Sequence, residues 1–224
     1  WMQMQQRYGV PAHLEGTDKG FAVIGYGKLG GYELGYGSDL DLVFLHNAPR
    51  GISTDGKKSI EAQQFYIKLA QRIMHLLNTK TLFGQLYETD LRLRPSGNAG
   101  LLCCHIDGFE KYQTEEAWTW EHQALVRARA ICGDPRLLND FTQVRNSILT
   151  RSRNAKTLAD DVCKMRLKMR EHLLSKENDK VDLKQCVGGI TDIEFMAQYL
   201  VLANAKSQAA MTEYPDNLRI FDAA

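Results

Sequence analysis

The spacing of apolar residues predicts short strands in the first half of the chain. Apolar runs occupy residues 21–25 and 41–46, and glycine or polar residues bound each run. Short runs of this kind between turn signals are typical of buried strands. A third strand is expected over residues 86–95, where a proline ends the run.

The third predicted strand carries one charged face. Because side chains alternate along a strand, four charged residues share one side, namely Glu88, Asp90, Arg92 and Arg94. The side between them is mainly apolar and suits packing. A face turned to solvent gives the same alternation, so the charged side alone does not identify a site.

Helical periodicity predicts one helix beside the strands and a helical second half. Apolar residues recur at helical spacing over residues 61–78, after a loop over 47–58, which indicates an amphipathic helix packed on the sheet. Four further helices are expected, over residues 115–129, 134–150, 158–173 and 192–205. The sequence therefore predicts an α+β fold that ends in a helical layer or bundle.

The composition is that of a soluble globular protein and argues against several classes. The chain has 224 residues, of which 44% are hydrophobic and 25% charged, and no apolar run approaches the roughly 20 residues of a membrane span. Its N-terminus lacks a signal-peptide pattern, so we expect a cytoplasmic protein with no membrane partner. The net charge of +1 argues against a nucleic-acid partner, and five cysteines without a C-x-x-C pair argue against a disulfide scaffold. Since the chain begins at Trp1 and stops within helical sequence, we expect a fragment of a longer polypeptide.

A glycine motif near the first strand suggests a dinucleotide-binding turn. Gly25, Gly27 and Gly30 match G-x-G-x-x-G after an apolar run. A Rossmann turn needs a crossover helix before the next strand, but residues 31–38 leave no room for one. No acidic residue ends the second strand either, so this interpretation is disfavoured.

A pair of aspartates directly after the glycines indicates a metal site instead. Asp39 and Asp41 form a D-x-D at the start of a strand, where both side chains point to one face. Two carboxylates this close repel each other, and a divalent cation such as Mg²⁺ removes the conflict. Asp90 is placed to complete a two-metal site, and Gly30 and Gly31 allow the backbone to approach a phosphate.

Longer motifs resemble one known family. The stretches G-Y-G-K-L-G-G-Y-E-L-G-Y-G-S-D-L-D-L, Y-E-T-D-L-R-L-R-P-S-G and G-G-I-T-D-I-E-F are similar to those of the glutamine synthetase adenylyltransferase family, within the DNA polymerase β-like nucleotidyltransferase superfamily. The resemblance covers nearly the whole chain and implies a polymerase β-like core. We divide the chain into a lead-in segment (1–17), a nucleotidyltransferase core (18–132) and a helical region (133–224) that is truncated at its end.

The resemblance implies a reaction and its participants. Family members carry two sister domains, one that attaches AMP from ATP to a tyrosine of glutamine synthetase and one that removes it by phosphorolysis. The stretch E-A-W-T-W-E-H-Q-A-L-V-R-A-R resembles the attaching domain. Glutamine synthetase is the implied protein substrate, and the PII signal protein is an expected partner.

The same resemblance assigns roles to site residues. It implies that Asp39, Asp41 and Asp90 are catalytic and hold two Mg²⁺ ions with ATP, with Asp90 able to accept the tyrosine proton. Six residues are predicted to bind the nucleotide, namely Lys28, Gly30, Gly31, Ser38, Arg92 and Arg94. Ser38 does not correspond to the serine of the superfamily's glycine–serine pair, whose place is taken by Gly30-Gly31.

Other residues and other classes remain open. Arg92 and Arg94 either bind phosphates or pair with nearby carboxylates, Arg127 and Arg129 are expected on a solvated helix face, and Glu194 is a candidate to touch the site. The six histidines show no metal spacing. A uridylyltransferase, a nucleic-acid polymerase and an inactive docking module are the alternatives to an adenylyltransferase.

Overall fold

The computed structural model describes residues 1–82, 84, 85, 87–173 and 182–224. The strands are β1 (Phe21–Gly25), β2 (Leu40–His46), β3 (Thr89–Asp90), β4 (Cys103–His105) and β5 (Arg129–Gly133). The helices are α1 (Met2–Tyr8), α2 (Gly27–Gly30), α3 (Ala62–Leu77), α4 (Ile106–Glu115), α5 (Thr119–Val126), α6 (Pro135–Leu149), α7 (Ala155–Leu173), α8 (Ile190–Asn204) and α9 (Asn217–Asp222). Two 3₁₀ turns cover Gly97–Ala99 and Ala209–Thr212. The predicted α+β fold is confirmed.

Strand β2 organises a five-stranded mixed sheet. The strands follow the order β3-β2-β1-β5, and β4 also pairs with β2. β1 is antiparallel to both β2 and β5, whereas β3 and β4 are parallel to β2. The register sets Asp41 beside Asp90 near the start of β2 and His46 beside His105 at its end. The two ends of one strand thus each carry a pair of like residues.

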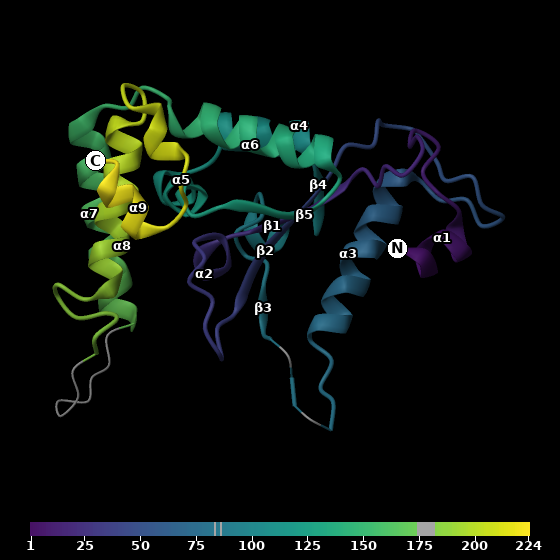
Figure 1. Cartoon of the computed structure of the whole chain (residues 1–224), viewed down its shortest axis with the longest axis horizontal. Helices are drawn as coiled ribbons and strands as arrows, with labels where there is room; N and C mark the ends of the chain where they lie inside the picture. The colour runs from purple at the N-terminus through teal and green to yellow at the C-terminus, as the bar shows by residue number, and fades with distance from the viewer. Residues whose placement is uncertain (83, 86, 174–181) are drawn as a thin grey trace.

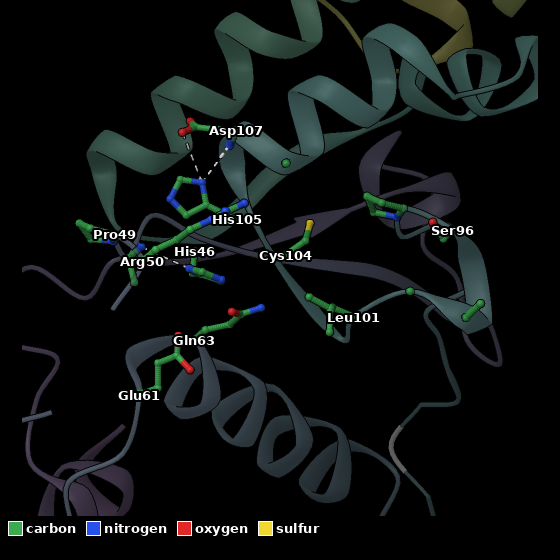
Figure 2. A pocket seen from close by; sticks show the side chains of 15 residues that line it. His46, Pro49, Arg50, Glu61, Gln63, Ser96, Leu101, Cys104, His105 and Asp107 are labelled. Atoms are coloured by element: carbon green, nitrogen blue, oxygen red, sulfur yellow. Dashed lines mark hydrogen bonds and ion pairs between the residues drawn. The ribbon is translucent and has the colours of Figure 1, made fainter. Parts of the chain in front are cut away.

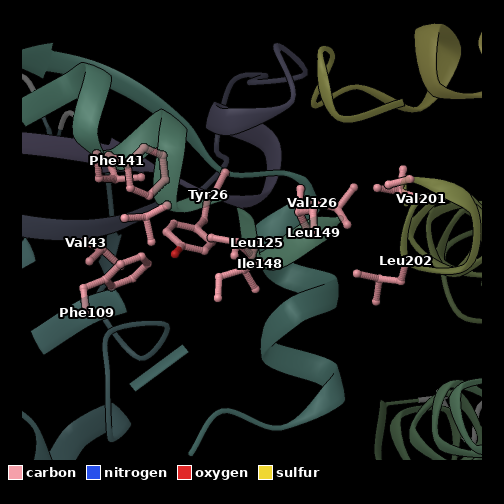
Figure 3. Packing of buried hydrophobic residues seen from close by; sticks show 14 of the residues in the cluster. Tyr26, Val43, Phe109, Leu125, Val126, Phe141, Ile148, Leu149, Val201 and Leu202 are labelled. Carbon is pink, nitrogen blue, oxygen red and sulfur yellow. The ribbon is translucent and has the colours of Figure 1, made fainter. Parts of the chain in front are cut away.

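Helices cover both faces of the sheet, because both faces are apolar. Ile24 and Leu45 belong to one buried cluster with residues of α4, α5, α6 and α8, part of which Figure 3 shows. Leu42 and Phe44 belong to a second cluster with α3. In Figure 1, α7, α8 and α9 gather at one end of the molecule and α1 and α3 at the other. A buried Leu or Phe contributes about 1.5–3 kcal/mol relative to an exposed one, so the two clusters fix β2 firmly between them.

Most of the predicted elements are confirmed. β1, β2, α3, α6, α7 and α8 lie within a few residues of the ranges expected from apolar spacing. One buried cluster continues from β1 and β2 into α8 and α9, so the helical region packs directly on the sheet. No described helix is both long and apolar enough to cross a bilayer.

The prediction of a long strand over residues 86–95 is wrong. Only Thr89–Asp90 pairs as a strand, and residue 86 lies outside the described residues. The chain turns directly afterwards, since the Arg92 amide donates to the Asp90 carboxylate and the Arg94 amide donates to the Leu91 carbonyl. A side chain that accepts a hydrogen bond from a backbone amide two residues later favours a turn over strand pairing. The expected alternation of charged residues on one strand face therefore does not extend past Asp90.

The prediction of one helix over residues 115–129 is also wrong at its C-terminal side. α5 ends at Val126, and the chain then forms β5 along the free edge of β1. Tertiary pairing overrides local helical spacing here, because an unpaired edge leaves backbone donors and acceptors unsatisfied. The sequence analysis also missed α1, β4, α4 and α9, which are short or lack clear periodicity.

Candidate active site

Three aspartates meet near the start of β2, as the sequence predicted. Asp41 is the second residue of β2, and its neighbour across the parallel register is Asp90 of β3. Asp39 lies one residue before the strand and is exposed, whereas Asp41 is half-buried. β3 pairs with β2 over only two residues, and one of the two is the aspartate that faces Asp41.

The surroundings act on the aspartates in opposite directions. Burial, reinforced by the charges of Asp90 and Asp39, raises the pKa of Asp41 to about 6. Hydrogen bonds from Arg92 lower the pKa of Asp90, because the Arg92 Nε lies 2.8 and 3.0 Å from the two carboxylate oxygens and its amide donates as well. The Arg92 Nη2 also pairs with Asp90, while the Arg92 side chain remains 74% exposed. Asp41 is therefore harder to ionise than a free aspartate, and its carboxylate has no direct partner among the described residues.

The donor set fits Mg²⁺ when the phosphates of a nucleotide are added. In the part of the chain that the structure describes, no three His, Cys, Asp or Glu side chains are arranged as a metal site. Mg²⁺ in proteins commonly takes one or two carboxylates and completes its shell with water and phosphate oxygens. Asp39 and Asp41 line one cavity and supply those two carboxylates. Asp90 becomes available only when it parts from Arg92.

A small cavity of about 280 Å³ joins the aspartates to the helical region. Its lining consists of Gly27, Lys28, Asp39, Asp41, Leu93, Ala124, Arg127, Lys184, Glu194 and Gln198. The Lys28 ammonium lies 3.3 Å from the Ser38 hydroxyl, and Ser38 is buried. Lys28 thus lies in the cavity as expected. Lys184 and Gln198 were missed, because no pattern in the sequence links them to the glycine turn.

The glycine turn packs more closely than its sequence suggested. The amides of Gly30 and Gly31 donate to the Tyr26 and Gly27 carbonyls, both at 3.0 Å. A Cβ at Gly30 would overlap the carbonyl oxygen of Arg127, and one at Gly31 would lie 2.6 Å from the Arg127 guanidinium. These glycines therefore permit contact with the segment before β5. Their predicted contact with a triphosphate stays a prediction.

Arg127 is buried, so the expectation of a solvated position is wrong. It is 3% exposed, and its two Nη atoms lie 2.6 Å from Glu33 and 2.7 Å from Glu194. Arg127 thereby joins the loop after the glycine turn to α8. Glu194 reaches the cavity, as the sequence analysis suggested.

Arg129 is the second arginine that the sequence analysis placed on a solvated helix. It lies in β5 and donates to the carbonyls of Leu29 and Gly30 at 3.0 and 3.1 Å. Its guanidinium also lies over the ring of Tyr32, 3.8 Å from the centroid. Both arginines were placed wrongly for the same reason, because α5 ends at Val126, before either of them.

Arg92 and Arg94 are engaged with the protein itself. Arg92 pairs with Asp90, which is one of the two roles expected from sequence. Arg94 donates to the carbonyls of Leu91, Asn98 and Gly100 at 2.8 to 3.3 Å and so holds the turn after β3. Phosphate binding by either arginine stays a prediction, and only Arg92 is exposed enough to swing toward a substrate.

Comparisons with known proteins identify the family of the chain. The model of the family described as glutamate-ammonia ligase adenylyltransferase matches residues 1–144. Over all 224 residues the chain is 89% identical to the bifunctional glutamine synthetase adenylyltransferase/adenylyl-removing enzyme of Alteromonas mediterranea. The chain spans 23% of the length of that curated relative. The match extends over the glycine turn, the three aspartates and the cavity, and the chain belongs to the glutamate-ammonia ligase adenylyltransferase family.

Proposed function

We propose that this chain transfers AMP from ATP to a tyrosine hydroxyl of glutamine synthetase and releases pyrophosphate. The carrying observation is the meeting of Asp39, Asp41 and Asp90 beside a cavity that also contains Lys28. Membership of the family supports the class of reaction. The near-neutral charge of +1 supports a protein acceptor over a nucleic acid.

The residues of the site support an in-line displacement. The tyrosine oxygen forms a bond to the α-phosphorus while the bond to the leaving pyrophosphate oxygen breaks. Asp90, freed from Arg92, accepts the proton of the tyrosine hydroxyl. Asp39 and Asp41 would hold Mg²⁺, which when bound neutralises charge on the phosphates. Lys28 adds a positive charge on the same wall.

Arg127 is a positioning residue in this proposal. Its ion pairs with Glu33 and Glu194 hold α8 against the glycine turn, and α8 also supplies Gln198 to the cavity wall. Both Nη atoms are engaged by glutamates and the Nε is buried, so we assign Arg127 a positioning role and not a phosphate contact. Its contribution is to keep the wall opposite the aspartates in place.

The second candidate is the reverse chemistry, removal of AMP by phosphorolysis. The relative from Alteromonas mediterranea is named for both activities, and an aspartate site of this kind suits either direction. Two parallel reactions with Mg²⁺ separate them. Unmodified glutamine synthetase is given α-labelled ATP, and AMP-modified glutamine synthetase is given phosphate.

Each outcome of this experiment has one meaning. Label on the unmodified substrate supports the adenylylating reaction. Release of ADP from the modified substrate alone would replace our proposal with the sister reaction. If neither occurs, while the full-length relative is active in the same tubes, this chain lacks stand-alone activity.

A PII partner and a pure docking role are tested separately. We propose that PII contacts the helical region, and a pull-down of each protein on the immobilised chain measures this. Capture of glutamine synthetase that survives both EDTA and the Asp39/Asp41 double substitution would favour the docking module over the enzyme.

A further inference from the structure

A second cleft lies at the end of β2 that is remote from the aspartates. Its volume is about 890 Å³, within the range of small-molecule sites. Five residue steps along β2 separate Asp41 from His46, or roughly 16 Å, so the two sites are distinct. Figure 2 shows the cleft between β4, the start of α4 and the start of α3. No step of the proposed reaction uses it.

A buried imidazole forms one wall of this cleft. His46 is only 2% exposed, and its Nδ1 accepts a hydrogen bond from the Ala48 amide at 3.2 Å. The neutral ring therefore carries its proton on Nε2. That Nε2 is buried and has no hydrogen-bond partner among the described residues. Among the buried side-chain atoms of the described residues that lack a partner, it is the one that belongs to a residue lining this cleft, which points to an acceptor bound there.

A second imidazole offers the same donor beside the first. The His105 Nδ1 accepts from the Asp107 amide at 3.1 Å, so the neutral ring carries its proton on Nε2, and the Asp107 carboxylate lies 3.6 Å from the same Nδ1. The rings of His46 and His105 are 5.3 Å apart between centroids and nearly perpendicular, at 87°. Both rings line the cleft, and Figure 2 shows them on the same wall.

Two further donors of the cleft are unengaged. Arg50 and Gln63 line it, and neither side chain makes a hydrogen bond or ion pair within the described residues. Arg50 is exposed at the rim and presents a guanidinium fork, which matches the two oxygens of a carboxylate. The cleft thus combines two imidazole N–H groups, an amide and a cation.

The rest of the lining selects among oxyanions. Pro49, Ala99 and Leu101 give an apolar portion that suits a short hydrocarbon body. Glu61 and Asp107 also line the cleft, and the Asp107 side chain is 85% exposed. These carboxylates repel any anion, and they repel a ligand with several negative charges, such as phosphate, more strongly than one with a single charge.

We propose that this cleft binds a small monocarboxylate whose oxygens accept from His46, His105 and Arg50. The inference rests on the cleft itself and holds whichever sister reaction the chain performs. Because β2 runs from this cleft to Asp41, a bound carboxylate would contact the strand that carries the catalytic aspartate.

Nuclear magnetic resonance on the whole chain, labelled with ¹⁵N-histidine, tests the proposal. Butyrate is titrated at constant ionic strength and pH 7, and each of the six histidines is assigned by single substitution. We expect saturable shifts of the Nε2 signals of His46 and His105, with the exposed His75 and His172 unmoved. Equal shifts of all six signals, no saturable shift, or an equal response to inorganic phosphate would each overturn the proposal.

Two variants identify the residues that bind. Arg50→Gln is expected to weaken butyrate binding at least tenfold, because the guanidinium supplies the charged donor. Lys58→Gln removes an equally exposed cation that does not line the cleft, and it should bind butyrate as the original chain does. Equal binding by both variants would mean that the carboxylate lies elsewhere. Both positions are exposed, so the fold should persist in each.

Discussion

The two ends of β2 place like residues side by side with opposite consequences. At the start, Asp41 lies beside Asp90, and at the end His46 lies beside His105. Burial is the main cause of the pKa shift at both ends, and the like neighbour adds to it, raising the pKa of Asp41 to about 6 and lowering that of His46 to about 4. The imidazole resolves the conflict by staying neutral.

At the aspartate end, no side chain among the described residues pairs with Asp41 and relieves the repulsion among the carboxylates. Asp41 is only half-buried, Asp39 is exposed, and neither carboxylate receives a hydrogen bond among those found in the described residues. Repulsion between the two histidines is thus avoided because His46 stays neutral. Repulsion among the aspartates remains, and a bound cation could neutralise it. Crowded charge that the fold leaves unsatisfied is the stronger indication of a catalytic site.

Of the changes considered, Asp41→Asn should have the largest effect, and this effect should be on activity at the aspartate end of β2. We expect transfer of AMP to fall by about 10³-fold or more, equivalent to roughly 4 kcal/mol, because the charge that holds the metal is lost. The melting temperature should stay equal or rise, because the substitution removes repulsion with Asp90. Labelled AMP incorporation and thermal unfolding measure the two quantities.

The matched control for this variant is Asp160→Asn, an exposed carboxylate on α7 that lines neither the aspartate cavity nor the cleft at the end of β2. It should leave the rate of AMP transfer unchanged. Retained activity in Asp41→Asn would contradict the assignment of Asp41 to the catalytic site.

Acid should reduce the stability that the histidine end contributes, whereas Asp41, whose folded pKa is raised to about 6, acts in the opposite direction over the same pH range. The folded pKa of His46 is about 4 and its ordinary value is 6.5, so the unfolded chain binds more protons between these values and stability falls as the pH drops from 6.5 to 4. The shift corresponds to about 3 kcal/mol. His13 and His105 contribute charge to the shift at His46, and burial lowers the pKa of His13 as well, which acts in the same direction. Urea unfolding at a series of pH values measures the slope.

A variant isolates His46 from other groups that titrate in this range. His46→Phe keeps a ring against Tyr66, which stacks on His46 at 5.2 Å, and removes the titration. Its stability should depend less on pH than that of the original chain, whereas the exposed His75→Gln should leave the slope unchanged. Identical slopes in all three proteins would show that His46 is not the group responsible.

Arg127→Met should show how much the buried arginine near the aspartates contributes to stability. Arg127 is the buried cation nearest the site that helps lower the pKa of Asp41, and it holds Glu33 and Glu194 together. We expect a loss of about 2 kcal/mol in the free energy of unfolding, below the usual cost of breaking a buried pair because both glutamates are partly exposed and can hydrate. Chemical denaturation measures the loss.

A surface arginine provides the control. Arg136→Met removes an arginine with 79% exposure and a long 3.8 Å contact to Asp18, and should change stability by less than about 0.5 kcal/mol. In Arg127→Met, kcat should fall while ATP binding persists, since the residue positions α8 and does not grip a phosphate. A variant that loses ATP binding with unchanged stability would instead make Arg127 a substrate contact.

The sequence predicted the aspartate end well and the histidine end hardly at all. Asp39 and Asp41 are two residues apart, so strand alternation alone places them together, and the position of Asp90 followed from a third strand with a charged face. Among the described residues only Thr89 and Asp90 pair as that strand, and Asp90 is the residue that lies beside Asp41.

The missed features depend on contacts between distant segments. His46 meets His105 through parallel pairing of β2 with β4, across 59 positions of sequence that carry no periodic signal for it. Arg127 is buried because β5 occupies the free edge of β1, where helical spacing suggested a solvated helix. Local patterns determine the elements, but the neighbours of a side chain depend on which edges remain unpaired.

Addition of Mg²⁺ should give the smallest effect and distinguish the two ends directly. A ligand that binds only the folded state stabilises it by RT ln(1 + [L]/Kd), which is about 1.4 kcal/mol at ten times Kd. We expect the melting temperature to rise by the amount that corresponds to this free energy in the original chain and in His46→Phe, because the histidine end takes no part in binding the ion. Asp41→Asn should show no rise. The three proteins share every other surface carboxylate. An equal rise in all of them would therefore mean that Mg²⁺ binds away from Asp41 and does not neutralise the aspartates.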